Sequence, residues 1–193
     1  MTFDEIFYLE DELANYTGAP YVVVTDGCTH AIELSLRWYK IKEVSFSAYT
    51  YISIPQTMLN LGIHYTLTDE IWTGEYQLHG SNIWDSARRL EPGMYRPGQV
   101  QCLSFGNGKP LSVGRCGAIL LDDQNAHYHL SRMRSDGRDL AVSPWITQEI
   151  FSQGWHYCPT LETVAQARQK LSHVEPQCQR AIYPDCRKIS IIV

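Results

Sequence analysis

The expected fold class follows from the stretch 21-YVVVTDGCTHAIELSL-36, in which a strand-like run is followed by apolar residues at helical spacing. Its first part, YVVVT, is a short continuous apolar run of the kind that forms a buried strand in a parallel sheet. After a short polar turn, apolar residues recur at helical spacing from His30 to Ile41. A strand that leads through such a turn into a helix is the repeating unit of an α/β domain.

The same alternation continues on both sides of this stretch. Residues 3–18 have helical spacing and end in Gly18, a common helix stop, and residues 54–62 are also helix-like. Further strand-like runs occupy residues 43–48, 64–69, 82–85, 101–105 and 117–123. After about residue 140 the strand signals fade, and residues 146–153 and 161–174 predict helices. The alternation predicts one α/β domain with a mostly parallel central sheet.

Composition limits the class of protein. The chain has 193 residues, a net charge of -5 and 44% hydrophobic residues, which is ordinary for a globular protein with one sizeable core. It contains no run of five or more basic residues, so we expect no nucleic-acid partner. Because the N-terminus is acidic and no apolar stretch is long enough to span a bilayer, we expect no membrane association and a cytoplasmic location. The six cysteines lack C-x-x-C spacing, which favours buried thiols over a zinc site or disulfides.

Polar residues gather where the predicted strands end, and ligands of α/β folds bind at the carboxyl ends of strands. The turn at Thr29 leaves the first N–H groups of a helix free to bind an anion, unless Asp26 or Thr29 itself caps that helix. Asp85 closes a strand, but is equally suited to cap a following helix. Tyr51 offers a flat ring at the same edge, or packs in the core.

Lys109 stands in the turn between two apolar runs and follows Ser104 along the chain. A lysine on a solvated loop is the ordinary alternative, because lysine is rarely buried. Taken together, however, an anion-binding helix start, an aromatic ring, a carboxylate and an amine are the contacts that pyridoxal phosphate needs. The amine binds the aldehyde, and the carboxylate keeps the pyridine nitrogen protonated. One such ligand explains these four groups at the strand ends better than four unrelated roles would.

Five motifs occur in order within about residues 3–137: EDELANYTGAPYVVV, GCTHAIELSL, SAYTYISI, IWDSARRL and SFGNGKPLSVGRCGAILLDD. Together they resemble the DegT/DnrJ/EryC1/StrS family of sugar aminotransferases, a fold-type I branch of the pyridoxal-phosphate enzymes. The resemblance implies the large domain of that fold, with a mostly parallel sheet covered by helices on both faces. Members of the family are longer and carry a small C-terminal domain. We therefore expect residues 1–193 to form a single compact cofactor-binding domain, with a helical extension from about residue 140 in place of the small domain.

The resemblance also implies roles for individual residues. Lys109 matches the lysine that forms a Schiff base with pyridoxal phosphate and moves the substrate proton, and Asp85 matches the partner of the pyridine nitrogen. These two are the expected catalytic residues. The other residues that match cofactor-binding positions are Cys28, Thr29 and the backbone of His30 in the phosphate-binding turn, Tyr51 as the stacking ring, and Ser104 on the phosphate.

The sequence departs from the family pattern at three places. Arg88 stands where the family usually has His or Gln beside the cofactor, which adds a permanent charge. Cys116 replaces a glycine of the family's G-x-G-G. His156 stands where a family asparagine reaches the phosphate bound by the neighbouring subunit, so His156 is a further expected cofactor-binding residue of a homodimer.

The resemblance implies an aminotransferase that moves an amino group, with glutamate as the expected donor, to a keto group of a nucleotide-linked deoxysugar. Relatives with histidine in place of the lysine are dehydratases, so Lys109 favours transamination. The alternative is a non-catalytic relative that serves as a binding or assembly partner, because the chain is short. The only other candidate constellation, the strand-like alternation His127-Tyr128-His129, lacks the further ligands of a metal site, so we expect a surface pair and no metal.

Overall fold

The structure is a computed structural model that describes residues 3–149 and 151–190. Its central sheet has the strand order β1 (Tyr21–Thr25), β8 (Gly117–Leu121), β7 (Val100–Ser104), β5 (Ile83–Asp85) and β4 (Tyr76–Gln77). Two smaller sheets pair β2 (Glu43–Ser47) with β3 (His64–Thr68), and β6 (Arg89–Leu90) with β9 (Gln177–Cys178). The helices are α1 (Asp4–Thr17), α2 (Cys28–Trp38), α3 (Ser53–Leu61), α4 (Gln124–Met133) and α5 (Leu161–Leu171), together with 3-10 turns at Trp145–Thr147 and Cys186–Lys188.

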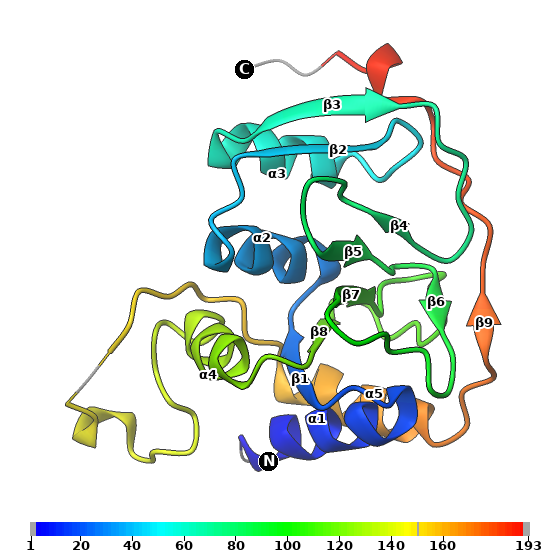
Figure 1. The fold of residues 1–193 in the computed structure, drawn as a ribbon. Coiled ribbons are helices and arrows are strands. Elements are labelled where there is room, and N and C mark those ends of the chain that lie inside the picture. Colours follow the sequence, from blue (N-terminus) through cyan, green and yellow to red (C-terminus); the bar gives the residue numbers. More distant parts are fainter. Residues whose placement is uncertain (1–2, 150, 191–193) are drawn as a thin grey trace.

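The central sheet is mixed, so the prediction of a mostly parallel sheet is wrong (Figure 1). β8 runs antiparallel to both of its neighbours, β1 and β7, and β4 runs antiparallel to β5. Of the pairings within this sheet in the described part of the chain, β5 with β7 alone is parallel. Even so, β1, β5 and β7 all point in the same direction, because two reversals at β8 cancel. Their carboxyl ends therefore share one edge of the sheet.

Connection lengths explain the reversed strands. A parallel pairing needs a crossover of a dozen or more residues, which is usually a helix. The loop 105–116 between β7 and β8 contains no helix, and residues 78–82 between β4 and β5 form only a short turn. Both connections therefore return the chain beside the strand it has just left. The α/β alternation predicts β5, β7 and β8 as strands but not these two directions.

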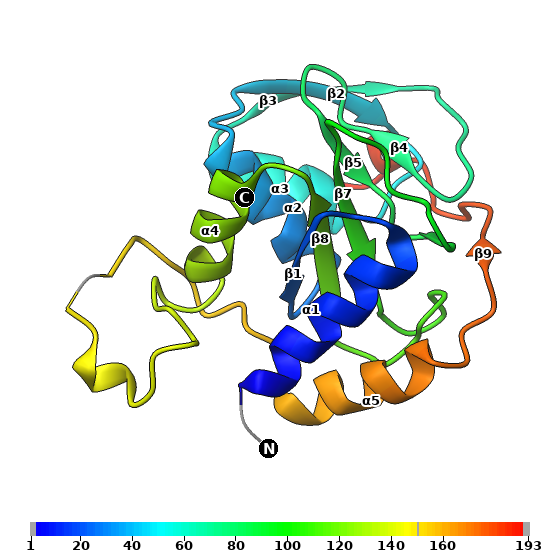
Figure 2. The same ribbon diagram turned by 60° about the horizontal axis from the view of Figure 1, so that its bottom comes forward.

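Helices cover both faces of the sheet, as expected (Figure 2). Side chains of β1 alternate between two cores, as they must in a strand. Val23 joins the core on the side of α2, α3 and α4, whereas Val22 and Val24 join the core on the side of α1 and α5. All three are at most 2% exposed. The apolar run of β1 is thus buried from both sides, which is why it shows no polar alternation.

Most of the predicted helices are confirmed. α1, α2, α3 and α5 lie within or close to the expected ranges, and α1 ends at Gly18, whose φ of 78° is the left-handed conformation of a glycine stop. The predicted helix 146–153 is wrong: Trp145–Thr147 forms one 3-10 turn, and the other described residues of that segment are irregular. Ile146 is 75% exposed. Because short helices need packing of an apolar face, this segment does not remain helical.

The strand-like reading of residues 127–129 is also wrong, because they lie inside α4. Asp123 caps this helix, since its side chain accepts hydrogen bonds from the N–H groups of Asn125 and Ala126. The buried residues of α4 are Ala126, Leu130 and Met133, at helical spacing. This cap followed by helical spacing is the signal that should have outweighed the alternation of histidines.

After α5, residues 177–188 run along the outside of the domain as an extended segment, here called the strap (Figure 1, orange to red). β9 lies in the strap and pairs with β6. Farther along, the N–H of Cys186 donates to the carbonyl of Ala48 over 2.9 Å. Of the expected helical extension after residue 140, the described α-helix is therefore α5, and the strap is mostly non-helical.

Within the described residues, the six cysteines are free thiols, of which Cys102, Cys116 and Cys186 are buried and Cys178 is exposed. The described helices are too short or too polar for any of them to cross a membrane.

Candidate active site

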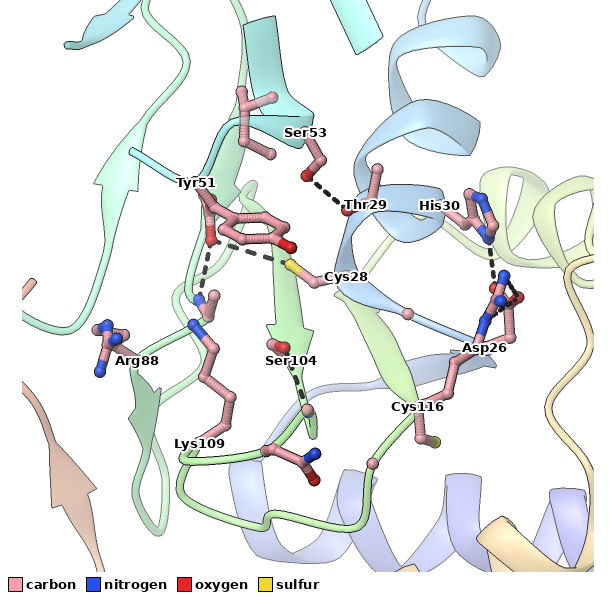
Figure 3. A pocket seen from close by; sticks show the side chains of 18 of the residues that line it. Asp26, Cys28, Thr29, His30, Tyr51, Ser53, Arg88, Ser104, Lys109 and Cys116 are labelled. Atoms are coloured by element: carbon pink, nitrogen blue, oxygen red, sulfur yellow. Dashed lines mark hydrogen bonds and ion pairs between the residues drawn. The ribbon is translucent and has the colours of Figure 1, made fainter. Parts of the chain in front are cut away.

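A cavity of about 620 Å³ lies at the edge where β1, β5 and β7 end (Figure 3). The shared direction of these three strands brings their polar carboxyl ends together there. The lining includes these sequence-predicted residues: Cys28, Thr29, His30, Tyr51, Asp85, Arg88, Ser104 and Lys109; Cys116 lines it as well. Of the predicted site residues, His156 alone is missing from it.

The start of α2 faces this cavity without a side-chain cap. Gly27 is its N-cap residue and offers no side chain, and the hydroxyl of Thr29 shares a 2.7 Å hydrogen bond with that of Ser53. Asp26 is engaged elsewhere, with Nδ1 of His30 at 2.5 Å. The alternative that Asp26 or Thr29 caps the helix is therefore wrong. The first N–H groups of a helix have no partner within it, and the helix dipole adds to their attraction for an anion.

Gly117 permits the turn before α2 to lie directly against the sheet. A Cβ at Gly117 would lie 2.6 Å from the nitrogen of Cys28 and 2.6 Å from the carbonyl oxygen of Leu103. No side chain fits so close to two backbone atoms. The departure at Cys116 is tolerated, because its thiol is buried in the core beside α1 and α5. Burial raises the pKa of this thiol to about 12. Of positions 116 and 117, it is thus 117 that requires a glycine.

Asp85 lies at the base of the cavity and is only 3% exposed. Its Oδ1 accepts a hydrogen bond from the N–H of Ala87 over 3.0 Å and a longer one, 3.8 Å, from the thiol of Cys28. Its Oδ2 accepts from the hydroxyl of Tyr76 over 3.0 Å. Since the residues that follow Asp85 form a turn and β6, the alternative role as a helix cap is wrong.

Burial raises the pKa of Asp85, although the hydrogen bond from Ala87 and the charge of Lys109 act in the opposite direction. Burial also raises the pKa of the Cys28 thiol well above its ordinary value, and the charge of Asp85 adds to that effect. The thiol is therefore protonated at neutral pH and serves as a donor to Asp85. A buried carboxylate with donors on several sides is suited to face a positively charged ring nitrogen.

Lys109 is half-buried and its amine points into the cavity (Figure 3). The loop 105–116 positions it through a turn in which the N–H of Lys109 donates to the carbonyl of Gly106 over 3.1 Å. Its Nζ donates a 2.6 Å hydrogen bond to the hydroxyl of Tyr183. The alternative of a lysine on a solvated loop is therefore wrong.

The aromatic and cationic groups of the cavity meet at the strap. Tyr51 is 57% exposed at the cavity rim, and its ring centroid lies 6.1 Å from that of Tyr183. The guanidinium of Arg88 lies 5.0 Å from the Tyr183 ring centroid and donates to Oε1 of Gln179 over 3.2 Å. Its Nε is buried and has no hydrogen-bond partner within the described chain.

The remaining predicted residues differ in how free they are to bind a ligand. Ser104 is at the end of β7, where, within the described chain, its hydroxyl accepts one long hydrogen bond, 3.4 Å, from the N–H of Gly106. The His30 ring is stacked on Tyr157 with a centroid distance of 3.6 Å, so its backbone N–H is the group left for an anion. His156 is 85% exposed and pairs with Asp136 at 3.0 Å. Its expected role in the site of a neighbouring subunit stays a prediction.

The histidines of α4 have structural partners. His127 stacks on Tyr21 at a centroid distance of 5.0 Å, and His129 stacks on Trp38 at 4.5 Å. Nowhere in residues 3–149 and 151–190 do three or more His, Cys, Asp or Glu side chains come together in a way that would hold a metal ion.

Sequence reasoning missed Tyr183 and Tyr76. Tyr183 is 74 residues from Lys109, and nothing near it in the sequence marks it as a site residue. Tyr76 faces Asp85 across the β4–β5 pairing, which depends on a turn direction that the periodicity does not reveal.

The chain resembles known proteins in part of its sequence and in its fold. Residues 2–78 match the model of the DegT/DnrJ/EryC1/StrS aminotransferase family. AtS13 from Actinomadura melliaura is 18% identical with a TM-score of 0.75, and the alignment covers 89% of this chain and 60% of AtS13. CalS13, a sugar aminotransferase from Micromonospora echinospora, is 17% identical with a TM-score of 0.71, and the alignment covers 88% of this chain and 60% of CalS13. DesI, solved in the presence of its TDP-sugar product, is 16% identical with a TM-score of 0.70, and the alignment covers 88% of this chain and 53% of DesI. No protein of curated function matches the chain in sequence.

At these identities the solved structures establish the fold, and this chain spans between 53% and 60% of their length. Asp85, Ser104 and Lys109 lie outside the segment that the family model matches, so their place in the cavity rests on the structure. Residues 2–78 are thus similar to the DegT/DnrJ/EryC1/StrS aminotransferase family, and the chain has an α/β fold that matches fold-type I pyridoxal-phosphate aminotransferase structures, with a mixed central sheet.

Proposed function

We propose that this protein is a pyridoxal-phosphate-dependent aminotransferase that acts on a nucleotide-linked deoxysugar, with glutamate as amino donor. One observation carries the proposal: the amine of Lys109 and the buried carboxylate of Asp85 line the same cavity as the uncapped start of α2. The family match supports the reaction class. The sugar acceptor is supported by CalS13, a sugar aminotransferase, and by the TDP-sugar product of DesI.

The residues present fit the cofactor. Its phosphate requires free N–H donors and a hydroxyl, which the start of α2 and Ser104 supply, and Gly117 keeps the α2 turn close to the sheet. Its ring requires a flat side chain, which Tyr51 offers, and a carboxylate, which Asp85 provides. The cavity of about 620 Å³ lies within the ordinary size range of cofactor sites.

When bound, pyridoxal phosphate supplies an electron sink and carries the amino group between two substrates. Asp85 would hold a proton on the pyridine nitrogen, because a carboxylate in a buried site stabilises a neighbouring positive charge. Lys109 would bind the cofactor through Nζ and, once released, move a proton at the substrate carbon as general base and acid. Arg88 would bring a permanent positive charge beside the ring, where the family usually has a different residue.

A homodimer with cytoplasmic location belongs to the same proposal, with His156 reaching the phosphate bound by the partner. The second candidate is a non-catalytic binding or assembly partner. This chain spans 53% to 60% of the length of these solved relatives. The site geometry favours the enzyme, because function depends on the chemistry of the site more than on fold analogy.

The test is to incubate the purified protein with pyridoxal phosphate, reduce it with borohydride and locate the adduct by peptide mass spectrometry. We expect the pyridoxyl group on Lys109, its loss in Lys109→Ala, and its retention in Lys40→Ala, which removes an exposed lysine. A reduced adduct spread over exposed lysines, or none at all, would contradict the proposal.

A second experiment separates the two candidates. Glutamate added to unreduced, cofactor-loaded protein is expected to abolish the absorbance of the lysine-bound cofactor as the amino group is taken up. If the cofactor binds Lys109 but glutamate and other amino acids leave the absorbance spectrum unchanged, the protein is a non-catalytic partner and not an aminotransferase.

A further inference from the structure

The strap carries Tyr183 across the cavity between two anchored ends. On one side, the N–H of Gln179 donates to the carbonyl of Arg88 over 2.8 Å, and β9 pairs with β6. On the other side, the N–H of Cys186 donates to the carbonyl of Ala48 over 2.9 Å. Tyr183 lies between these anchors. The backbone therefore fixes where the phenol can reach.

The surroundings of Tyr183 hold its ring in one orientation. The ring stacks on Trp72, with centroids 6.0 Å apart and an interplanar angle of 26°. Trp72 is itself 4% exposed, and its Nε1 donates to the carbonyl of Tyr49 over 2.8 Å. The guanidinium of Arg88 lies on the ring at 5.0 Å from its centroid. The hydroxyl then points at Lys109, with Oη and Nζ 2.6 Å apart.

Lys109 needs such a partner because the turn fixes its backbone but not its side chain. A lysine side chain has four rotatable bonds and a large rotamer entropy, which is lost when the amine is held in one place. Gly108 precedes it with a φ of 72°, a conformation open to glycine, and is itself exposed. Within the described residues, Lys109 forms no ion pair, so the phenol is the group that holds its amine.

We propose that Tyr183 is a positioning residue for Lys109: its hydroxyl holds the amine inside the cavity, and the strap forms the outer wall behind it. The use of that amine in catalysis rests on the proposed function, whereas the hydrogen bond between the two side chains does not. Tyr183 acts through Lys109.

Reductive methylation with formaldehyde and cyanoborohydride tests this in the absence of any cofactor. The rate at each lysine is read by peptide mass spectrometry, with the exposed Lys40 and Lys42 as internal references. Tyr183→Phe keeps the ring and removes the hydroxyl. We expect methylation of Lys109 to be about fivefold faster in this variant, the effect of losing one hydrogen bond. Ile182→Ala changes a neighbouring strap residue that is 79% exposed and is expected to match the wild type.

Tyr183→Ala distinguishes the hydroxyl from simple shielding. If Lys109 reacts at the wild-type rate in Tyr183→Phe and faster only in Tyr183→Ala, the ring merely covers the amine and the proposal is overturned. Equal rates in all variants overturn it as well. Far-UV circular dichroism and unfolding temperature establish that each variant is folded, and unchanged rates at the reference lysines exclude a global effect.

The same variants, treated with pyridoxal phosphate and borohydride, separate this inference from the proposed function. Faster methylation in Tyr183→Phe with no pyridoxyl adduct in the wild type means that the positioning contact exists but the cofactor reading fails. An adduct on Lys109 in the wild type, together with unchanged methylation in Tyr183→Phe, means that the cofactor reading stands and the positioning role is wrong.

Discussion

The hydroxyl of Tyr76 donates a 3.0 Å hydrogen bond to Oδ2 of Asp85, and the two residues face each other across the β4–β5 pairing. Both are buried, at 1% and 3% exposure. The same hydroxyl shares a 2.6 Å hydrogen bond with the hydroxyl of Thr50. Burial raises the pKa of Tyr76 well above its ordinary value, so the phenol keeps its proton and remains a donor to the carboxyl group.

Replacing Tyr76 by Phe removes one donor from Asp85 while keeping the ring in the core. We expect unfolding free energy to fall by about 1–2 kcal/mol, because a buried acceptor loses its partner. The pKa of Asp85 should rise further, since the Tyr76 hydrogen bond lowers it. Urea unfolding measures the first effect and infrared titration of the carboxyl group the second. Tyr128→Phe, at a position 51% exposed, should change neither; an unchanged carboxyl titration in Tyr76→Phe would refute the assignment.

Asp85→Asn is expected to make the protein more stable at neutral pH relative to the wild type and to weaken ligand binding. Because burial raises the pKa of Asp85 in the folded protein, its contribution to stability is fully present below the ordinary carboxyl pKa and is lost as pH rises through the raised value. An amide does not titrate. The variant should therefore gain stability relative to the wild type as pH rises to neutrality, yet bind pyridoxal phosphate more weakly under the proposed function.

Thermal unfolding from acidic to neutral pH measures the stability difference, with Asp11→Asn as a control on an exposed residue of α1. A stability difference that is independent of pH would show that Asp85 does not titrate as its burial implies. Unchanged cofactor affinity in Asp85→Asn would count against its role at the ring nitrogen.

Gly117→Ala is expected to lower the free energy of unfolding. The added Cβ would lie 2.6 Å from the nitrogen of Cys28 and from the carbonyl oxygen of Leu103, so backbone must shift at the start of α2. Overpacking of this kind typically costs about 1–3 kcal/mol. Gly27→Ala is the matched comparison, because nothing lies within 4 Å of a Cβ there. Chemical unfolding of both variants decides the matter, and equal stabilities would contradict the close approach.

Arg134 forms a buried ion pair with α1, and its loss is expected to lower the free energy of unfolding strongly. It is 1% exposed, binds the carboxylate of Glu10 and donates to the carbonyl of Val24 over 2.6 Å. Arg134→Met leaves the Glu10 carboxylate buried without its partner, and breaking such pairs costs about 3–5 kcal/mol. Arg138→Met, which removes a partly exposed pair with Asp136, should cost less than about 1 kcal/mol. Similar losses in the two variants, measured by urea unfolding, would refute this ranking.

Several features of the site could be read from residues that are close together in the chain. Gly18 marks the end of α1, and the polar turn around Thr29 marks the start of α2. Asp85 is the last residue of an apolar strand, and Lys109 follows another. Their meeting in one cavity follows because β1, β5 and β7 run in the same direction. The physical signals here are periodicity and turn chemistry, which depend on neighbouring residues.

Features that depend on contacts between distant residues could not be read in this way. The reversal of β8 is set by the path of loop 105–116, and the failure of the helix at 146–153 reflects missing apolar support for Ile146. Tyr183 reaches Lys109 only because the strap is anchored before and after it by backbone hydrogen bonds to other segments. Local preferences thus specify the elements and the ends that carry chemistry. Strand direction and the phenol at the lysine arise only from packing and hydrogen bonding across the folded chain, which no short stretch encodes.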